Sequence, residues 1–173
     1  MARIDPIDDD SPGVDAELMR ALRARRGGRL LNLDRQLLHS PPLARGWNHY
    51  MGAVRAETVL DGGLRELVIL LVACLNRAPY EFAQHAPVAL DEGLSQPQID
   101  AVAAWRTSAL FDPLQRDVLA YAEAMTLQVQ VAQRLFDAVR RRLSDRELIE
   151  LTATVASYNM VSRFLEALQV QIE

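Results

Sequence analysis

A glutamate and a histidine four residues apart are the residues in this sequence whose types and spacing best suit chemistry. Glu81 and His85 follow Pro79 closely, and side chains at positions i and i+4 of a helix share one face within contact range. In the first turn of a helix the positive helix end favours a carboxylate. A histidine one turn later can accept or deliver a proton near neutral pH. The pair therefore suits general acid–base catalysis; the alternative is a surface pair worth roughly 0.2–0.5 kcal/mol.

Polar residues also interrupt the apolar pattern of the last predicted helix. Tyr158 and Ser162 are four residues apart, as are Asn159 and Arg163. A guanidinium on such a face can hold a substrate carboxylate through two parallel hydrogen bonds. It can equally pair with Glu166 or with a neighbouring subunit, so both interpretations stay open.

A third patch contains Trp47, which follows the segment Ser40-Pro41-Pro42 and can belong to the core or to the wall of a pocket. The sequence contains no Ser-His-Asp order, no glycine-rich phosphate loop and no HExxH spacing. Its three histidines have no convergent spacing. We therefore expect no metal site.

Composition excludes several classes of partner and chemistry. The 173 residues carry a formal net charge of −4, and no Lys/Arg block stands out as a nucleic-acid footprint. The longest apolar run, Leu67–Leu75, is well short of the roughly 18 residues of a membrane span. The acidic N-terminus lacks the apolar region of a secretory signal, and Cys74 is the single cysteine. We expect a cytoplasmic protein with a buried, inert thiol, which cannot perform dithiol chemistry within one chain.

The elements that must position these residues are all predicted to be helices. Alternation with period two is missing, whereas helix caps and breakers are frequent. We predict an all-α protein with a disordered head over residues 1–12 and one domain over residues 13–173. Its eight or nine helices include Val14–Arg26, Asn32–His39, a helix capped by Ser40 that reaches Glu57, Leu64–Leu75, Pro79–Asp91, Gln96–Trp105, Pro113–Leu127, Ala132–Leu143 and a long last helix capped by Ser144.

The motifs Arg65–Leu70 and Tyr80–His85 resemble the carboxymuconolactone decarboxylase family, which shares its fold with the alkylhydroperoxidase D-like (AhpD-like) proteins. The resemblance covers about residues 30–173. It implies an AhpD-like multi-helix fold and a homo-oligomer, a trimer or hexamer. Nearly continuous apolar helices agree with this, because they need neighbours on every side. Further matching motifs are Leu31–Leu33, His39–Leu43, Arg45–Trp47, Gly93–Ser95, Ser144–Glu147 and Tyr158–Phe164.

The peroxidase branch of this superfamily carries a Cys-x-x-Cys pair, a histidine four residues later and a relay glutamate on the preceding helix. The histidine and the glutamate match His85 and Glu66, but the two cysteine positions fall on Ala78 and Glu81. A thiol must ionise to attack a peroxide and a second thiol must resolve the product. The resemblance therefore indicates peroxidase ancestry without dithiol activity, in an uncharacterised branch closer to the decarboxylases, which use no cofactor.

The resemblance thus implies a cofactor-free acid–base enzyme, a lyase of decarboxylase, isomerase or lactone type, that acts on a small carboxylated or lactone-type molecule. His85 would be the acid or base, while Glu81 and Glu66 would orient it or relay protons. Substrate contacts are expected from Tyr80, Arg163, Tyr158, Asn159 and Trp47. Two alternatives remain: a peroxidase-type oxidoreductase, as the ancestry suggests, and a non-catalytic assembly module whose polar residues form interface pairs.

The separation between the Glu66 carboxylate and the His85 ring tests the proposed relay. A short connection at residues 76–78 predicts an antiparallel pair of helices. That topology alone puts Glu66 near the end of the second helix, away from Glu81. The resemblance is what places Glu66 at the site, and about 3 Å, or a one-water bridge, would suit a relay.

Overall fold

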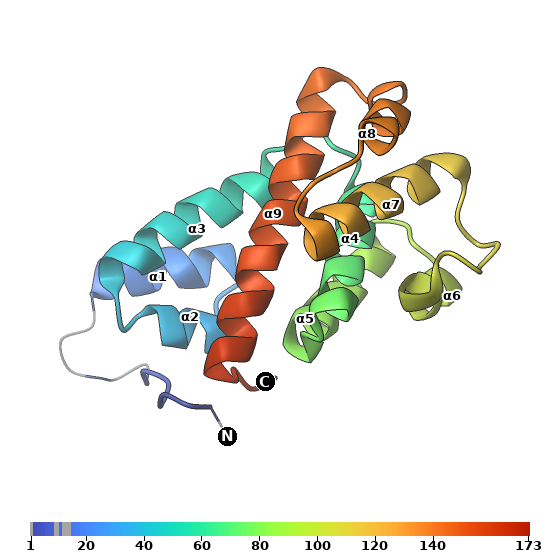
Figure 1. The fold of residues 1–173 in the computed structure, drawn as a ribbon. Coiled ribbons are helices and arrows are strands. Elements are labelled where there is room, and N and C mark those ends of the chain that lie inside the picture. The colour runs from blue at the N-terminus through green and yellow to red at the C-terminus, as the bar shows by residue number, and fades with distance from the viewer. Residues whose placement is uncertain (1, 9–10, 12–14) are drawn as a thin grey trace. The chain divides into compact units, whose positions relative to one another are not determined.

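The structure is a computed structural model that describes residues 2–8, 11 and 15–173. Nine α-helices and one short 3-10 helix form the secondary structure of these residues, and none of them lies in a strand (Figure 1). The predicted all-α class with eight or nine helices is therefore confirmed. The chain divides into two compact units, an N-terminal unit of Met1–Glu57 with Leu165–Glu173 and a central unit of Thr58–Phe164.

The N-terminal unit is a small helical cluster in which α1 and α2 both pack against α3. Asp15 caps α1, because its Oδ1 accepts from the backbone N–H groups of Glu17 and Leu18, each at 3.0 Å. The fully buried carboxylate of Asp34 accepts from Arg26 Nε at 3.1 Å and from a backbone N–H, which compensates its burial. The helices of this unit are α1 (Ala16–Arg25), α2 (Asn32–Leu37) and α3 (Pro41–Ala56).

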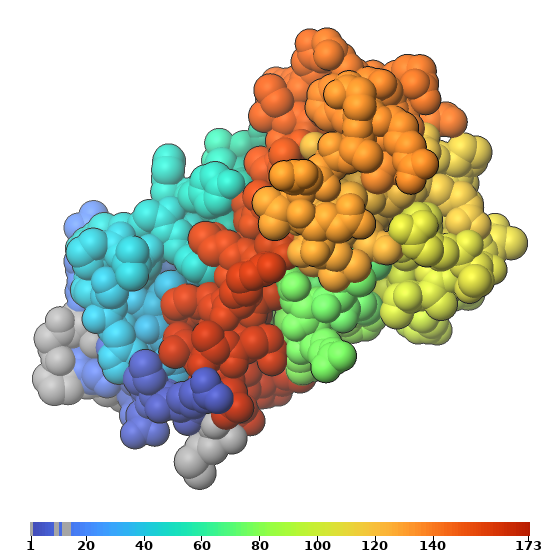
Figure 2. All heavy atoms as spheres, viewed as in Figure 1, coloured from blue at the N-terminus to red at the C-terminus, as the bar shows by residue number. Residues whose placement is uncertain are grey.

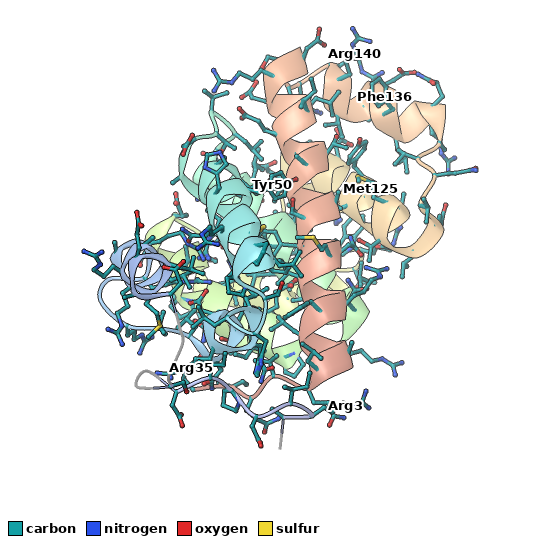
Figure 3. All side chains as sticks on the ribbon, turned by 90° about the vertical axis from the view of Figure 1, so that its left-hand side faces the viewer. Arg3, Arg35, Tyr50, Met125, Phe136 and Arg140 are labelled. Carbon is teal, nitrogen blue, oxygen red and sulfur yellow. The ribbon has the colours of Figure 1, made fainter. Side chains whose placement is uncertain are left out.

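Part of the predicted disordered head, residues 1, 9, 10 and 12, lies outside the described residues. The described part makes hydrogen bonds within the N-terminal unit. Arg3 donates from its backbone N–H to Leu168 O at 3.0 Å, and Ile4 O accepts from Gln36 Nε2 at 2.7 Å. Arg3 lies beside the C-terminal end of α9, the helix Asp145–Leu168 (Figure 3). These contacts tie residues 3 and 4 to helices from both ends of the sequence.

The central unit is organised around one helix, α4 (Gly62–Asn76), whose residues from Gly63 to Ala73 are all buried. It packs against α5, α7 and the 3-10 helix η1, so its apolar side chains find their neighbours within one chain. The apolar character of α4 therefore does not require a partner subunit, and the expected homo-oligomer stays a prediction. The remaining elements are α4 (Gly62–Asn76), α5 (Pro79–Asp91), α6 (Gln96–Ala101), η1 (Val102–Ala104), α7 (Pro113–Gln128), α8 (Gln133–Arg140) and α9 (Asp145–Leu168), which ends in the N-terminal unit.

Most helix ends lie within two or three residues of the predicted ones, and α8 ends at Arg140 instead of Leu143. Ser144 and Glu147 form the predicted reciprocal cap at the start of α9: Ser144 N–H donates to Glu147 Oε2 at 2.8 Å, and Glu147 N–H donates to Ser144 Oγ at 3.2 Å. The predicted helix from Gln96 to Trp105 instead changes at Ala101 into η1, a tightening that is common at helix ends. Helices α7 and α8 pack against each other, and their atoms form adjoining parts of the surface in Figure 2.

The connection between α4 and α5 turns on a residue in a left-handed conformation. Arg77 has a φ of 54° and follows the last residue of α4. The N–H of Ala78 returns to the carbonyl of Ala73 at 2.9 Å, which satisfies a carbonyl at the helix end. This tight closure makes the α4–α5 pair antiparallel, as the short connection predicted.

In the part of the chain that the structure describes, no helix has the length and apolar character needed to cross a membrane.

Candidate acid–base site

The centre of the candidate site is a hydrogen bond between helices α4 and α5. His85 Nδ1 lies 2.6 Å from Glu66 Oε2, which is the separation expected for a relay. Both side chains are buried, with exposed fractions of 4% for His85 and 1% for Glu66. Because a carboxylate only accepts, the proton on Nδ1 points to Glu66, and Nε2 becomes the ring atom that can take or release a proton.

Glu66 is held in turn by an arginine that bridges two glutamates. Arg65 Nε lies 3.2 Å from Glu66 Oε1, and Arg65 Nη2 lies 2.6 Å from Glu92 Oε1. A buried carboxylate needs such a partner, because an unpaired buried charge is expensive. The result is a continuous chain of charged groups from half-exposed Glu92 through Arg65 and Glu66 to His85.

Glu92 was not predicted as part of the site, although the sequence contains a signal for it. It follows the last residue of α5 directly, and an antiparallel pair places that end beside the start of α4, where Arg65 lies. Gly62 lies against the Glu92 carboxylate, and a Cβ at this position would overlap it unless the Glu92 side chain moved. The same topology explains why Glu66 contacts His85, one turn nearer to the end of α5 than Glu81.

Glu81 is anchored by α9. Ser162 Oγ lies 3.1 and 3.0 Å from the two carboxylate oxygens of Glu81, and 2.8 Å from the backbone carbonyl of Tyr158. Glu81 is 1% exposed and Ser162 is fully buried. The single hydroxyl hydrogen can go to the carboxylate or to the carbonyl, so the proton on this serine and the charge of Glu81 are linked.

Tyr158 packs its ring against His85, with the ring centroids 4.8 Å apart and the planes at 87°. This edge-to-face contact fixes the plane of the imidazole. Tyr158 and Ser162 are one turn apart on α9, as His85 and Glu81 are on α5, and the pairs meet in reverse order. Tyr80, which was predicted to contact substrate, is buried on α5 at 3% exposure.

Asn159 and Arg163 lie together, although in a different arrangement from the one the sequence suggested. Arg163 Nη1 donates to Asn159 Oδ1 at 2.7 Å, and the same oxygen accepts from Asn76 Nδ2 at 3.0 Å. Asn159 Nδ2 donates to Thr126 Oγ1 at 2.9 Å. Asn159 thus connects the C-terminal ends of α4 and α7 to α9 and holds the exposed Arg163, whose contact with substrate stays a prediction.

Trp47 and Cys74 are the two other residues that the sequence analysis singled out. Trp47 is half-buried on α3 of the N-terminal unit, and its role as a pocket wall stays a prediction. Cys74 is half-buried on α4, and burial raises the pKa of its thiol, which disfavours the reactive thiolate. Among the residues that the structure describes, His, Cys, Asp and Glu side chains form no group of three suited to a metal ion.

Comparisons with known proteins agree with this architecture. The model of the carboxymuconolactone decarboxylase family matches residues 41–124. A comparison with curated protein sequences finds no match. Similar solved structures include an uncharacterised peroxidase-related protein from Silicibacter sp. TM1040, with 16% identity over 99% of this chain and 92% of that chain and a TM-score of 0.86. An AhpD core protein from Ralstonia eutropha JMP134 has 20% identity over the same shares and a TM-score of 0.86.

A third similar structure is the debrominase Bmp8 in complex with 2,3,4-tribromopyrrole. It is 20% identical over 100% of this chain and 94% of that chain, with a TM-score of 0.82. At these identities the three structures establish a common all-α fold.

Proposed function

We propose that this chain, which matches the carboxymuconolactone decarboxylase family model over residues 41–124 and shares its fold with AhpD-like structures, is a cofactor-free acid–base enzyme in which His85 transfers protons to and from a small molecule. The observation that carries the proposal is the buried contact of 2.6 Å between His85 Nδ1 and Glu66 Oε2. A carboxylate that accepts from one ring nitrogen orients the imidazole and stabilises its protonated form, so the other nitrogen acts as a base and then as an acid.

The reaction class follows from what one positioned imidazole can do. In an isomerisation, Nε2 of His85 removes a proton from a carbon beside a carbonyl and returns it to another carbon. In a decarboxylation, the C–C bond breaks, its electron pair stays on the substrate as CO2 leaves, and the imidazolium protonates that carbon. Both need Glu66 to balance the charge of the ring while the proton is held. A substrate carboxylate would bind Arg163, and Tyr80 would contact the substrate.

Two positions argue against a dithiol peroxidase. Ala78 and Glu81 stand where the resemblance places the two redox cysteines. The remaining thiol, Cys74, has its pKa raised by burial, which lowers the fraction of the nucleophilic thiolate. A debrominase of the same fold binds a small heterocycle, which supports a small organic molecule as the substrate of this chain.

Exchange of carbon-bound hydrogen with D2O tests the proposal without knowledge of the natural substrate. We would follow α-angelica lactone and acetoacetate by NMR in D2O, with and without the protein. Deuterium incorporation, isomerisation or CO2 release should depend on His85 and disappear in His85→Gln. The exposed His49→Gln and the Cys74→Ser variants serve as matched controls and should behave like the parent. If neither probe, nor related lactones and keto acids, reacts above the His85→Gln background, the proposal is refuted.

The second candidate function is a non-catalytic helical module, and the burial of the site favours it. Glu66, Glu81 and His85 are at most 4% exposed in the single chain, so the network can serve as a satisfied polar core. Diethyl pyrocarbonate, which modifies accessible imidazoles, separates the two functions. The structural role is favoured if only His39 and His49 are modified in the folded protein, and if none of the lactone or keto-acid probes changes the rate at which His85 is modified.

A further inference from the structure

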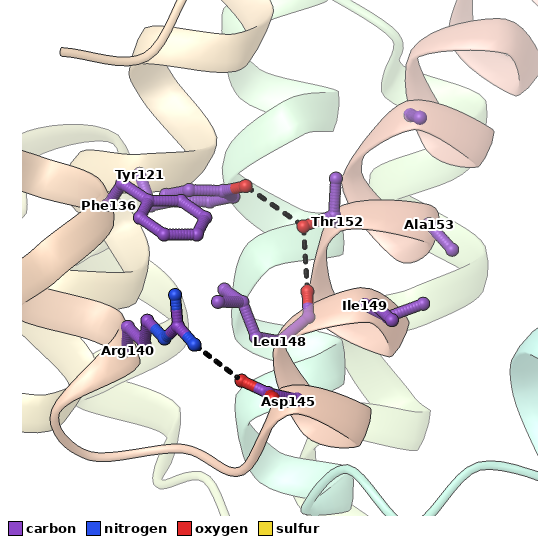
Figure 4. A pocket seen from close by; sticks show the side chains of 9 residues that line it. Tyr121, Phe136, Arg140, Asp145, Leu148, Ile149, Thr152 and Ala153 are labelled. Carbon is purple, nitrogen blue, oxygen red and sulfur yellow. Dashed lines mark hydrogen bonds and ion pairs between the residues drawn. The ribbon is translucent and has the colours of Figure 1, made fainter. Parts of the chain in front are cut away.

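A cavity outside the acid–base network lies between α7, α8 and α9 of the central unit. Its volume is about 630 Å³, which falls in the range of roughly 300–1,000 Å³ that is typical of small-molecule sites. Tyr121 comes from α7, and Phe136 and Arg140 come from α8 (Figure 4). We refer to this cavity as the α7–α9 pocket.

The walls of the α7–α9 pocket are mainly apolar. Leu148, Thr152 and Ala156 of α9 are four residues apart and therefore share one face of the helix. Phe136 and Arg140 have the same spacing on α8 and lie together on it (Figure 3). A flat aromatic molecule fits such a site, because it can stack on the Phe136 ring and pack against the aliphatic face of α9.

The pocket has one hydrogen-bond acceptor whose direction can be worked out. Tyr121 Oη lies 2.9 Å from Thr152 Oγ1, and Thr152 Oγ1 donates to the carbonyl of Leu148 at 2.7 Å. Because threonine has one hydroxyl hydrogen, Tyr121 must be the donor in the first contact. The oxygen of Tyr121 then keeps a lone pair with which it can accept a hydrogen bond from a ligand.

The charges at the rim balance each other. Arg140 Nη2 and Asp145 Oδ1 are 3.5 Å apart, and their side chains are 57% and 79% exposed. Such a pair contributes little energy, but its two charges cancel beside an apolar pocket. A bound anion would be attracted by Arg140 but repelled by Asp145, and a bound cation the reverse. Neither charge gains a net attraction, so the pocket favours an uncharged ligand.

We propose that the α7–α9 pocket binds small uncharged aromatic alcohols, with the ring between Phe136 and α9 and the ligand hydroxyl donating to the Tyr121 oxygen. The pocket shares no residue with the Glu66–His85 network, so the proposal does not depend on the proposed catalytic function.

Two fluorescent probes that differ in one hydrogen-bond donor test this. 2-Naphthol carries the hydroxyl, whereas 2-methoxynaphthalene has the same ring system without a donor. We expect 2-naphthol to bind more tightly to the parent protein, and Tyr121→Phe to weaken it by about fivefold, the value of one neutral hydrogen bond. The affinity for 2-methoxynaphthalene should change by less than about twofold in the same variant. Tyr50→Phe, in the N-terminal unit, is the matched control and should leave both affinities unchanged.

Filling the pocket tests its location. Ala156 is exposed, so Ala156→Phe is compatible with folding and should weaken both probes at least about tenfold by occupying their volume. Ala167→Phe, at another exposed position of α9, should have no effect. The proposal is overturned if neither probe binds more tightly to the parent than to Ala156→Phe, or if Tyr121→Phe weakens both probes equally. It is also overturned if sedimentation shows that a second copy of the chain fills the pocket and that Ala156→Phe dissociates it.

Discussion

Replacing Glu66 by glutamine is the perturbation that examines the candidate site most directly. The carboxylate of Glu66 accepts from Arg65 Nε at 3.2 Å and from His85 Nδ1 at 2.6 Å. A glutamine has the same shape but only one accepting oxygen. Arg65 can only donate, so the amide oxygen must face it, and the amide NH2 must face His85. The ring can accept this hydrogen bond only if its own proton moves to Nε2.

The expected loss of stability follows from the burial of the pair. Breaking a buried ion pair by removing one partner costs about 3–5 kcal/mol. Glu66→Gln should lie at the lower end, near about 3 kcal/mol, because Arg65 keeps its contact with Glu92 at 2.6 Å and the amide retains one hydrogen bond. For a chain of this size, that corresponds to a decrease in Tm of about 6–12 °C.

Urea unfolding would measure the free energy, and ¹⁵N NMR of the ring nitrogens would show which nitrogen of His85 carries the proton. The exposed Glu57→Gln variant removes the same charge at the end of α3 and should change neither quantity. A loss below about 1 kcal/mol together with an unchanged tautomer would show that Glu66 does not orient His85, and the proton-transfer argument would fail with it.

Four further predictions concern the rest of the chain. Hydroperoxide reduction with a dithiol donor should stay at background, because Ala78 has no thiol and the pKa of Cys74 is raised by burial; turnover that Cys74→Ser abolishes would contradict this. Arg77→Gly should stabilise the protein by about 1 kcal/mol in urea unfolding, since glycine adopts the φ of 54° without steric cost. A loss of stability would mean that contacts of the Arg77 side chain contribute more than the relief of backbone strain. Hydrogen bonds from the Ser144 hydroxyl and then from its backbone N–H lower the pKa of Glu147. The stabilisation of the fold by this cap is therefore complete above the ordinary carboxyl pKa and is lost as the pH falls through the lowered pKa. Glu147→Gln should reduce Tm at neutral pH but not at strongly acidic pH, and an effect independent of pH would contradict the linkage. Sedimentation at micromolar concentration should show a homo-oligomer, a trimer or hexamer, and a monomer would exclude it.

The helices could be predicted from the sequence largely because their ends carry local chemical signals. The Ser144–Glu147 cap and the stop at Gly93 depend on neighbouring residues only, so their positions hold in the structure. The boundary between α6 and η1 could not be predicted, because the change from α to 3-10 geometry depends on how η1 packs against α4.

The candidate site was predictable in part. The family resemblance placed Glu66 at the site with His85. The antiparallel topology of α4 and α5 explains why Glu66 meets His85 and not Glu81, and it also brings Arg65 to Glu92. The hydrogen bond from Ser162 to Glu81 was not available, because the sequence does not specify how α9 is rotated about its axis. The catalytic roles assigned to these residues stay predictions.

The matched one-turn spacing on α5 and α9 makes the site sensitive to the length of α9 as well as to its side chains. Tyr158 and Ser162 meet His85 and Glu81 from a helix that begins at Asp145. One residue inserted between Asp145 and Tyr158 would rotate everything beyond it by about 100° relative to the part of α9 before it. Both contacts would then be lost together, although no contacting residue had changed. A change in the length of the loop before Ser144 would therefore leave these contacts in place, whereas insertions or deletions within this stretch of α9 should be rare.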